Sequence, residues 1–568
     1  MKVLIIGGVA GGATCAARLR RLDEKAEIIM FEKGEYISFA NCGLPYYIGG
    51  EITEKSRLTV QTPESINASY NVDVRIFNEV ISIDRKSKKV AVKNLRTNET
   101  YDESYDKLVL SMGSEPIKPR LQGVDSDKVF TLRNIPDTYR IKDYVNKTSA
   151  KSAVIIGGGA IGVEMAENLK NIGLEVTIVE MLDQVIAPLD YDMAQDVQNH
   201  LLFNGVNLIL GNGLKSIEDN GKNLNITLND GTLSADMLIM SIGVRPESKL
   251  AKDCGLSLNE RGCIKVNEHM ETDDPDIYAI GDAIEVVDFV TMQKAFVPLA
   301  GPANKQGRIA ADNICGIKSS YAGTQGSSII KVFDMTVAST GVNEKTCKRL
   351  GLSYDKCFVY PTSHANYYPG ATSMSIKTIF EKPSGKVLGA QIVGFDGVDK
   401  RCDVFATAIR ANMTVYDLAQ LELCYAPPYS SAKDPVNMAG FAAENILKGL
   451  VKTYHWNDVK DLINRDDVIL IDVRKSIEYE SSHIDGYINI PLEDIRKKIN
   501  ELDKNKKVYT TCKMGLRSYT ACRILTEYGF ECYSLSGGYR LYNSIFGKKP
   551  TVKASSPKNE TANDVKKN

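Results

Sequence analysis

The chain has 568 residues and a formal net charge of −1, with 70 basic and 71 acidic side chains. This length predicts roughly three to five domains, each large enough for its own core, and the balanced charge argues against a nucleic-acid binder held by phosphate contacts. No apolar run reaches about 18 residues and the opening KVLIIGG is too short for a signal peptide, so neither a membrane span nor a secretory leader is expected.

The twelve cysteines contain no CxxC pair and no regular framework, which predicts free thiols in a reducing cytoplasm. The histidines are scattered along the chain without the spacing of metal ligands, so no metal site is expected. They are His200, His269, His364, His455 and His483.

Residues 2–33 are predicted to form a strand, a glycine loop, a helix and a second strand. The loop glycines allow a tight turn, and the helix N-terminus can then receive a pyrophosphate. Glu32 closes the second strand, at the distance expected for a carboxylate that binds ribose hydroxyls. The GxGxxG pattern is imperfect because Val9 replaces its middle glycine. The glycines of this loop are Gly7, Gly8, Gly11 and Gly12.

The stretch SFANCGLPYY, residues 38–47, follows this unit and carries a lone cysteine, Cys42. Dithiol flavin reductases have a second cysteine at the position of Tyr47. The stretch is predicted to open a helix, whose N-terminus would favour the thiolate. The alternative is a small, inert, buried cysteine, and the neighbouring nucleotide units favour the reactive interpretation.

Residues 152–180 repeat the strand, glycine loop, helix and strand, with the complete pattern at Gly157, Gly159 and Gly162. Glu180 closes the second strand, where a carboxylate accepts hydrogen bonds from the adenosine ribose and repels a 2′-phosphate. No basic residue follows directly, so the pattern predicts NADH, with NADPH as the second option. Two complete units on one chain are strong evidence for two dinucleotide sites.

Thr272–Ala283 places Gly281 and Asp282 after an apolar strand. In flavoprotein disulfide reductases this signature is where an aspartate meets the flavin ribityl chain. Residues 108–116 and 238–246 resemble the crossover strands of that class, which gives an FAD half, an NAD insert and a second FAD half. The strand-like runs that follow residue 320 resemble the interface domain that makes the dimer.

Three motifs together resemble the coenzyme A-disulfide reductases: SFANCGLPYY, HANYYPGA (364–371) and YAPPYSSAKDPVN (425–437). In that family the cysteine matching Cys42 forms a mixed disulfide with CoA, and tyrosines matching Tyr367 and Tyr425 reach the site from the partner subunit. A tyrosine hydroxyl can hydrogen-bond or protonate a developing thiolate. The alternative is that these Tyr-Pro clusters are packed turns.

The resemblance also implies ligand-binding residues by position, although Tyr70 stands near where that family has a lysine. For FAD they are Gly7, Gly8, Ala10, Gly11, Gly12, Glu32, Lys33, Gly113, Gly281, Asp282, Pro298, Leu299 and Ala300. For the nicotinamide they are Gly157, Gly159, Ile161, Gly162, Glu180 and Gly243. For CoA they are Thr14, Arg18, Arg21, Ser38, Asn41 and Lys433, with the two arginines on one helix face as a phosphate clamp.

A compositional change near Val451 marks a new domain that resembles a single rhodanese domain. Cys512 follows an apolar strand and opens the loop CKMGLRS, whose inward N–H groups can stabilise a thiolate or persulfide. Arg517 adds positive charge to this loop. Ser482 and Tyr487 depart from common rhodanese usage without touching it.

The predicted fold class is α/β: two Rossmann-like domains for FAD and NAD, an α+β dimerisation domain and a small α/β rhodanese domain. The predicted boundaries are 1–116 and 243–320 for the FAD halves, 117–242 for NAD(P)H, 321–446 for the interface, 452–549 for rhodanese and 550–568 for a disordered tail.

We expect a cytoplasmic homodimeric enzyme that uses FAD and NADH to reduce CoA disulfide, CoA persulfide or polysulfide, with coenzyme A as substrate or bound ligand. Cys512 would supply the sulfane sulfur. One alternative is an NADH oxidase or peroxidase of the same fold, which usually has a histidine at the position of Ala10. The other is a non-catalytic thiol redox sensor or sulfur carrier, against which the complete NAD loop speaks.

Overall fold

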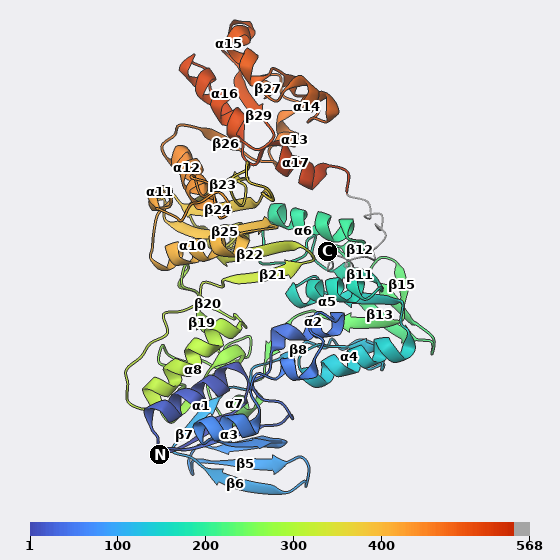
Figure 1. The fold of residues 1–568 in the computed structure, drawn as a ribbon, viewed down its shortest axis with the longest axis vertical. Helices are drawn as coiled ribbons and strands as arrows, with labels where there is room; N and C mark the ends of the chain where they lie inside the picture. Colours follow the sequence, from blue (N-terminus) through green and yellow to red (C-terminus); the bar gives the residue numbers. More distant parts are fainter. Residues whose placement is uncertain (550–568) are drawn as a thin grey trace, which may run out of the picture.

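The computed structural model describes residues 1–549. The tail that the sequence predicts to be disordered, 550–568, lies outside the described residues. Four units follow one another along the long axis of the molecule, from the N-terminal sheet at one end to the C-terminal domain at the other (Figure 1). No helix within residues 1–549 is long and apolar enough to cross a membrane.

The first unit is a five-stranded parallel sheet of order β18-β7-β1-β2-β3. Its central strand, β1, is buried along most of its length, as expected for a parallel sheet covered on both faces. A late strand, β18, pairs with β7, so segments far apart in the chain share this sheet. The strands are β1 (Lys2–Ile6), β2 (Glu27–Glu32), β3 (Asp73–Ile76), β7 (Lys107–Leu110) and β18 (Ile277–Ala279), with helices α1 (Ala10–Leu22), α3 (Pro63–Tyr70), α7 (Lys249–Asp253) and α8 (Ala300–Ile314) and the antiparallel strands β4 (Asn78–Asp84), β5 (Lys89–Asn94) and β6 (Thr100–Ser104).

The second unit repeats the design with a parallel sheet of order β12-β11-β10-β16-β9. A two-stranded crossover, β8 (Ser114–Pro116) with β17 (Val244–Pro246), joins it to the first unit. The sheet strands are β9 (Val129–Phe130), β10 (Ser152–Ile156), β11 (Glu175–Glu180), β12 (Val206–Leu210) and β16 (Met237–Met240), with α4 (Ile135–Thr148), α5 (Ala160–Asn171), α6 (Tyr191–Phe203) and the hairpin strands β13 (Leu214–Asp219), β14 (Leu224–Leu228) and β15 (Thr232–Ala235).

The third unit consists of an antiparallel sheet of order β21-β22-β25-β24-β23 that packs against helices. Every residue of β25 is buried, which places this strand at the centre of the unit's core. The elements are β21 (Ser328–Val332), β22 (Met335–Gly341), β23 (Tyr354–Val359), β24 (Ser375–Glu381), β25 (Val387–Gly394), α9 (Glu344–Leu350), α10 (Val398–Arg410), α11 (Val415–Gln420) and α12 (Pro435–Leu447), preceded by the short strands β19 (Val286–Val287) and β20 (Lys294–Ala295).

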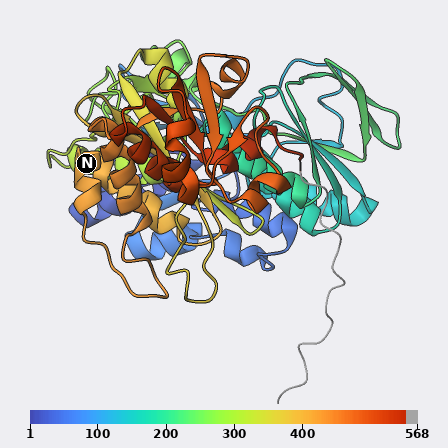
Figure 2. The ribbon, with the colours of Figure 1, turned by 90° about the horizontal axis from the view of Figure 1, so that it is seen from above.

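The fourth unit is a small parallel sheet of order β26-β30-β29-β27-β28, flanked by helices. Figure 2 shows it from above, lying over the third unit. Its elements are β26 (Lys452–Tyr454), β27 (Val468–Asp472), β28 (Ile488–Asn489), β29 (Lys507–Thr511), β30 (Cys532–Leu535), α13 (Val459–Leu462), α14 (Ser476–Ser481), α15 (Ile495–Lys498), α16 (Leu516–Glu527) and α17 (Gly538–Phe546). The fold class predicted from the sequence is confirmed.

The fourth unit is packed firmly onto the others through α17. Leu541 and Ile545 belong to the same apolar core as residues of α6. Around this core, Arg540 Nη1 donates to Ser373 Oγ at 2.7 Å and Ser544 Oγ donates to Asp196 Oδ1 at 2.9 Å. The C-terminal unit is therefore a docked domain, held by more than the short linker near Val451.

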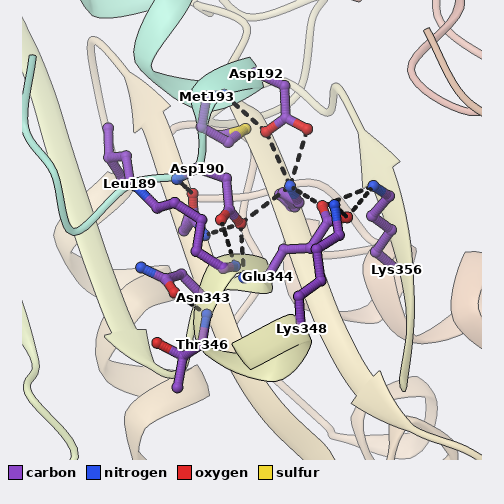
Figure 3. A network of polar contacts seen from close by, with 12 residues as sticks. Leu189, Asp190, Asp192, Met193, Asn343, Glu344, Thr346, Lys348 and Lys356 are labelled. Carbon is purple, nitrogen blue, oxygen red and sulfur yellow. Dashed lines mark hydrogen bonds and ion pairs between the residues drawn. The ribbon is translucent and has the colours of Figure 1, made fainter. Parts of the chain in front are cut away.

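A buried network of charges lies where the second, third and fourth units meet. Lys377, fully buried, contacts Asp192 at 2.9 Å and Glu344 at 2.8 Å. Lys356 adds a second cation to Glu344 at 2.6 Å, and Trp456 Nε1 donates to Asp192 at 3.4 Å. Figure 3 shows Asp192 descending from one side and Glu344 and Lys356 approaching from the other. Because removing one member would leave a buried charge unpaired, the network fixes how the three units meet.

Candidate active sites

The first glycine loop fits a dinucleotide closely. A Cβ at Gly7 would lie 2.3 Å from the Ser111 carbonyl oxygen, and one at Gly12 would lie 1.9 Å from the Gly7 carbonyl oxygen. Gly7 also has a φ of +98°, so this turn requires glycine. The loop therefore leaves the N-terminus of α1, a 13-residue helix, open to a pyrophosphate.

Polar groups predicted for FAD surround that loop. Glu32 accepts hydrogen bonds from the backbone N–H of Gly8 at 3.1 Å and of Gly34 at 2.9 Å, and burial raises its pKa. Asp282, directly after β18, accepts from Ser114 Oγ at 3.0 Å. The carboxylates thus stand at the carboxyl ends of two strands in one sheet, where ligands of open α/β sheets bind. Lys33 instead forms an ion pair with Glu247 at 2.6 Å.

The second glycine loop has the same geometry. A Cβ at Gly157 would lie 2.2 Å from the Ser241 carbonyl oxygen, whereas Gly159 faces open space. Glu180 is held by the N–H of Gly158 at 2.6 Å and of Leu182 at 2.8 Å. This chain therefore contains a second complete cradle for a dinucleotide, with a fixed carboxylate at the end of its second strand.

Cys42 is exposed, in a short 3-10 turn (Asn41–Gly43) that leads into the six-residue helix α2 (Leu44–Gly49). Partial burial of the thiol sulfur, and then the charge of Glu164, raise the pKa of Cys42. The expectation that the helix would favour the thiolate is wrong for this chain by itself, because desolvation and the nearby carboxylate both disfavour the charged form and α2 is short. Asn41 Oδ1 is buried beside it without a hydrogen-bond partner, an acceptor left open for a ligand.

Sequence reasoning missed Glu164 and Tyr46. Glu164 lies on α5, the helix that follows the second glycine loop, and Tyr46 lies on α2 beside Cys42. The Tyr46 hydroxyl donates to Glu164 Oε1 at 3.4 Å, and burial raises the pKa of Glu164 to about 7. In the sequence Glu164 is marked only by its position two residues after Gly162, which says nothing about Cys42. Its proximity to the cysteine loop appears only in the tertiary fold.

Tyr367 and Tyr425 do come together. Their hydroxyls are 2.8 Å apart, on two loops that project from one side of the molecule (Figure 2). Both side chains are exposed, Tyr367 to 71% and Tyr425 to 49%. The exposure of both side chains favours the interpretation in which this hydrogen-bonded pair meets a group from outside this chain.

The residues predicted for CoA are distributed along α1, the cysteine loop and the region before α12. Arg18 forms an ion pair with Asp312 at 2.7 Å, whereas Arg21 is exposed and its guanidinium lies 6.0 Å from the Tyr70 ring centre. Thr14 donates to Asn304 at 2.6 Å. The two arginines are not held together as a clamp in this chain. Ser38 and Asn41 border Cys42, and Lys433 is exposed.

Cys512 lies in a loop that is held by hydrogen bonds from residues of the C-terminal domain. Its side chain is 1% exposed, and the Gly515 N–H donates to its Sγ at 3.1 Å. The N–H groups of Tyr539 and Arg540, on α17, donate to the carbonyl oxygens of Cys512 and Lys513 at 2.8 and 3.0 Å. The predicted inward N–H is therefore present, and the helix that docks the domain also holds the cysteine loop.

Arg517 differs from its expected role. Its guanidinium donates to both carboxylate oxygens of Glu478, at 2.6 and 2.8 Å, so the positive charge predicted for the loop is balanced. Hydrogen bonding to Arg517 lowers the pKa of Glu478 to about 2. Glu478 lies on α14, and nothing in the sequence pattern links it to the CKMGLRS loop.

Comparisons with known proteins agree with this architecture. Residues 1–307 match the pyridine nucleotide-disulphide oxidoreductase family, residues 327–435 its dimerisation domain and residues 455–544 the rhodanese-like domain. A coenzyme A disulfide reductase of Staphylococcus haemolyticus is 37% identical over 447 residues, which cover 78% of this chain and 100% of that protein.

Two solved structures extend the likeness to the C-terminal domain. Reduced CoADR-RHD of Bacillus anthracis has a TM-score of 0.95 and 53% identity, covering 96% of this chain and 98% of that one. An NAD-dependent persulfide reductase from A. fulgidus has a TM-score of 0.90 and 38% identity, covering 95% and 100%.

The fold and sites thus define a flavoprotein oxidoreductase with an attached sulfurtransferase-like domain. The chain belongs to the pyridine nucleotide-disulphide oxidoreductase family. Membership implies FAD and a pyridine nucleotide as cofactors, and the matching dimerisation domain supports a homodimer. The predicted enzyme class is confirmed.

Proposed function

We propose that the protein is an FAD-dependent, NADH-using reductase of CoA disulfide, CoA persulfide and polysulfide. The observation that carries the proposal is the exposed, lone Cys42 in the turn just before α2, a short helix that contacts α5, the helix of the second dinucleotide loop. The names of the similar proteins, a coenzyme A disulfide reductase and a persulfide reductase, support the same substrate class.

Different carboxylates would bind the two cofactors. Glu32 and Asp282 would hold the FAD ribose and ribityl hydroxyls, and Glu180 would hold the ribose of NADH and repel a 2′-phosphate. When bound, FAD would carry the electron pair from the nicotinamide to the sulfur chemistry.

Cys42 would act as the nucleophile. Its thiolate attacks one sulfur of CoA disulfide, so a new Cys42–CoA disulfide forms, the old S–S bond breaks, and one CoA thiolate leaves with the electron pair. Tyr367 and Tyr425 of the partner subunit would donate hydrogen bonds to that leaving thiolate. Their mutual contact at 2.8 Å supports their action as a pair.

The C-terminal domain would supply sulfur. Cys512 accepts a sulfane sulfur as a persulfide and passes it to CoA or to Cys42, and Arg21, Asn41, Lys433 and the other CoA candidates would receive the coenzyme. These thiol reactions suit a reducing compartment such as the cytoplasm, consistent with twelve free cysteines.

The test is steady-state kinetics with CoA disulfide, CoA persulfide, polysulfide and elemental sulfur as acceptors, with NADH oxidation and sulfide release both measured. Substrate-dependent NADH oxidation with stoichiometric sulfide or CoA thiol supports the proposal. NADH oxidation that depends on oxygen alone would make the protein an NADH oxidase, and flavin that NADH does not bleach would leave a sensor or sulfur carrier.

A further inference from the structure

Two arginines near the Cys512 loop are paired with carboxylates of the same domain. Arg517 is bound by both carboxylate oxygens of Glu478, at 2.6 and 2.8 Å. Arg474 is buried, forms an ion pair with Asp472 at 2.6 Å, and lies 4.1 Å from the ring centre of Tyr539, a residue of α17. Each arginine therefore has its own carboxylate, and neither presents an uncompensated charge to an incoming anion.

The Arg517–Glu478 pair keeps this state over the whole working pH range. The carboxyl of Glu478 has its pKa lowered to about 2, so it stays ionised, and the pKa of Arg517 is raised by the same hydrogen bonds. The pair also has the bidentate geometry that holds arginine and carboxylate in one orientation. It does not open by titration.

Apolar side chains accompany the ion pair. Ile477, next to Glu478, is 75% exposed, and Leu516, next to Arg517, is 68% exposed. Met514, inside the CKMGLRS loop, is 41% exposed. The ion pair joins α14 to the start of α16, and these three exposed apolar residues, called the apolar rim below, flank it in the chain. Lys513 is the exposed cation of this loop.

We propose that Glu478 determines which sulfur donor Cys512 accepts: by neutralising Arg517 it disfavours the thiosulfate dianion, and the apolar rim favours an organic persulfide with an uncharged arm. This inference rests on the proposed function, in which Cys512 loads sulfane sulfur, and it names the donor class. Glu478 is a positioning residue that acts through Arg517.

The two loading reactions differ in the charge they bring to the thiolate. With an organic hydropersulfide, Cys512–S⁻ attacks the outer sulfur of R–S–SH, the S–S bond of the hydropersulfide breaks, and R–S⁻ leaves with the electron pair, giving Cys512–S–SH. With thiosulfate, Cys512–S⁻ attacks the outer sulfur of S–SO₃²⁻ and sulfite leaves with the electron pair, giving Cys512–S–S⁻. Only the second reaction brings two negative charges to a thiolate, so only it depends strongly on an uncompensated cation.

The experiment compares two donors on full-length holoenzyme carrying Cys42→Ser, without NADH, so that sulfur loads only through Cys512. Thiosulfate and N-acetylcysteamine persulfide are the probes, and cyanide is the acceptor, with thiocyanate formation as the readout. Glu478→Gln removes the charge but keeps an oxygen that can accept from the Lys475 N–H, as Glu478 does at 3.2 Å. Glu480→Gln is the matched control, since Glu480 is exposed on the same helix.

We expect Glu478→Gln to raise kcat/KM for thiosulfate by about tenfold through the freed cation and to change that for the organic persulfide less than about threefold. Glu480→Gln should change neither. In an Arg517→Leu background, Glu478→Gln should have no further effect on the ratio of the two donors, which a merely structural role of Glu478 would not produce.

Equal changes for both donors, a fall with thiosulfate, or the same effect in the Arg517→Leu background would overturn the inference. If the persulfide loads wild-type Cys512 and Glu478→Gln leaves the donor ratio unchanged, the inference fails alone. If neither donor loads wild-type Cys512, the sulfur-supply part of the proposed function fails with it.

Discussion

The two cysteines proposed to react, Cys512 and Cys42, differ in burial and in which domains surround them. Cys512 is buried, and its loop is closed by hydrogen bonds from Gly515, just before α16, and from α17 of the same domain. Cys42 is exposed, and its surroundings come from the first unit and, through Glu164, from the second. The C-terminal domain therefore completes the Cys512 loop by itself, whereas the proposed reducing site at Cys42 is formed where two domains meet.

The largest effect expected at the self-contained site comes from Cys512→Ser. Transfer of sulfur from a donor to cyanide should fall by at least about 10³-fold, because a hydroxyl is a far poorer nucleophile toward sulfur. Reduction of preformed CoA disulfide should stay within about twofold, since it needs only Cys42 and the cofactors. Thiocyanate formation measures the sulfur transfer and NADH oxidation measures the reduction of CoA disulfide, both on the same preparation. A matching loss of CoA disulfide reduction would contradict the independence of the sites.

The next largest effect is expected from the two tyrosines proposed to act at the Cys42 site. Tyr367→Phe and Tyr425→Phe should each slow CoA disulfide turnover, within the range of about 10²–10⁴-fold typical of positioned acid–base groups. Because the two hydroxyls hydrogen-bond to each other, the double variant should lose less than the sum of the single free-energy changes. Steady-state kcat, with flavin content as the folding control, decides this. Wild-type turnover in all three would return the tyrosines to a packing role.

A smaller effect is expected at the second glycine loop. We predict that NADH is preferred to NADPH and that Glu180→Gln lowers the NADH-to-NADPH ratio of kcat/KM by about tenfold, the worth of one charge-assisted hydrogen bond. The Gly158 and Leu182 N–H groups donate to different carboxylate oxygens of Glu180, so the single amide oxygen of the variant can accept from only one of them, and some loss of kcat/KM is expected with both nucleotides. Equal or better use of NADPH by the wild-type protein would show that other residues set the preference.

The smallest effect concerns the charge beside Cys42. Glu164 has its pKa raised to about 7, chiefly by burial, so its negative charge is present above that pH and opposes the Cys42 thiolate. Glu164→Gln should therefore speed alkylation of Cys42 at pH 8 and have little effect at pH 6, where the wild-type carboxyl is mostly protonated. Mass spectrometry of the Cys42 peptide gives the rate, with the Cys512 peptide as internal control. An equal change at both pH values would mean that the variant alters exposure instead.

Much of the molecule follows from local sequence signals. Gly7 and Gly157 occupy positive-φ turns that only glycine tolerates easily, so both dinucleotide cradles could be predicted. The Cys512 loop could be predicted for a different reason, because its strand, cysteine and helix follow one another directly in the sequence. Sequence reasoning missed the contacts between residues that are distant in the chain. Examples are Glu478 with Arg517, Tyr46 with Glu164, and Lys377 with Asp192. A charged residue on an ordinary helix gives no sign of its partner until the tertiary fold supplies it.

Rapid-mixing spectroscopy tests most directly whether Cys42 alone links the flavin to the sulfur substrate. Wild-type, Cys512→Ser and Cys42→Ser proteins are bleached anaerobically with one equivalent of NADH and then mixed with CoA disulfide. We expect that all three bleach, that wild type and Cys512→Ser regain their flavin absorbance at the same rate, and that Cys42→Ser stays bleached. Reoxidation of Cys42→Ser by CoA disulfide near the wild-type rate would contradict this expectation.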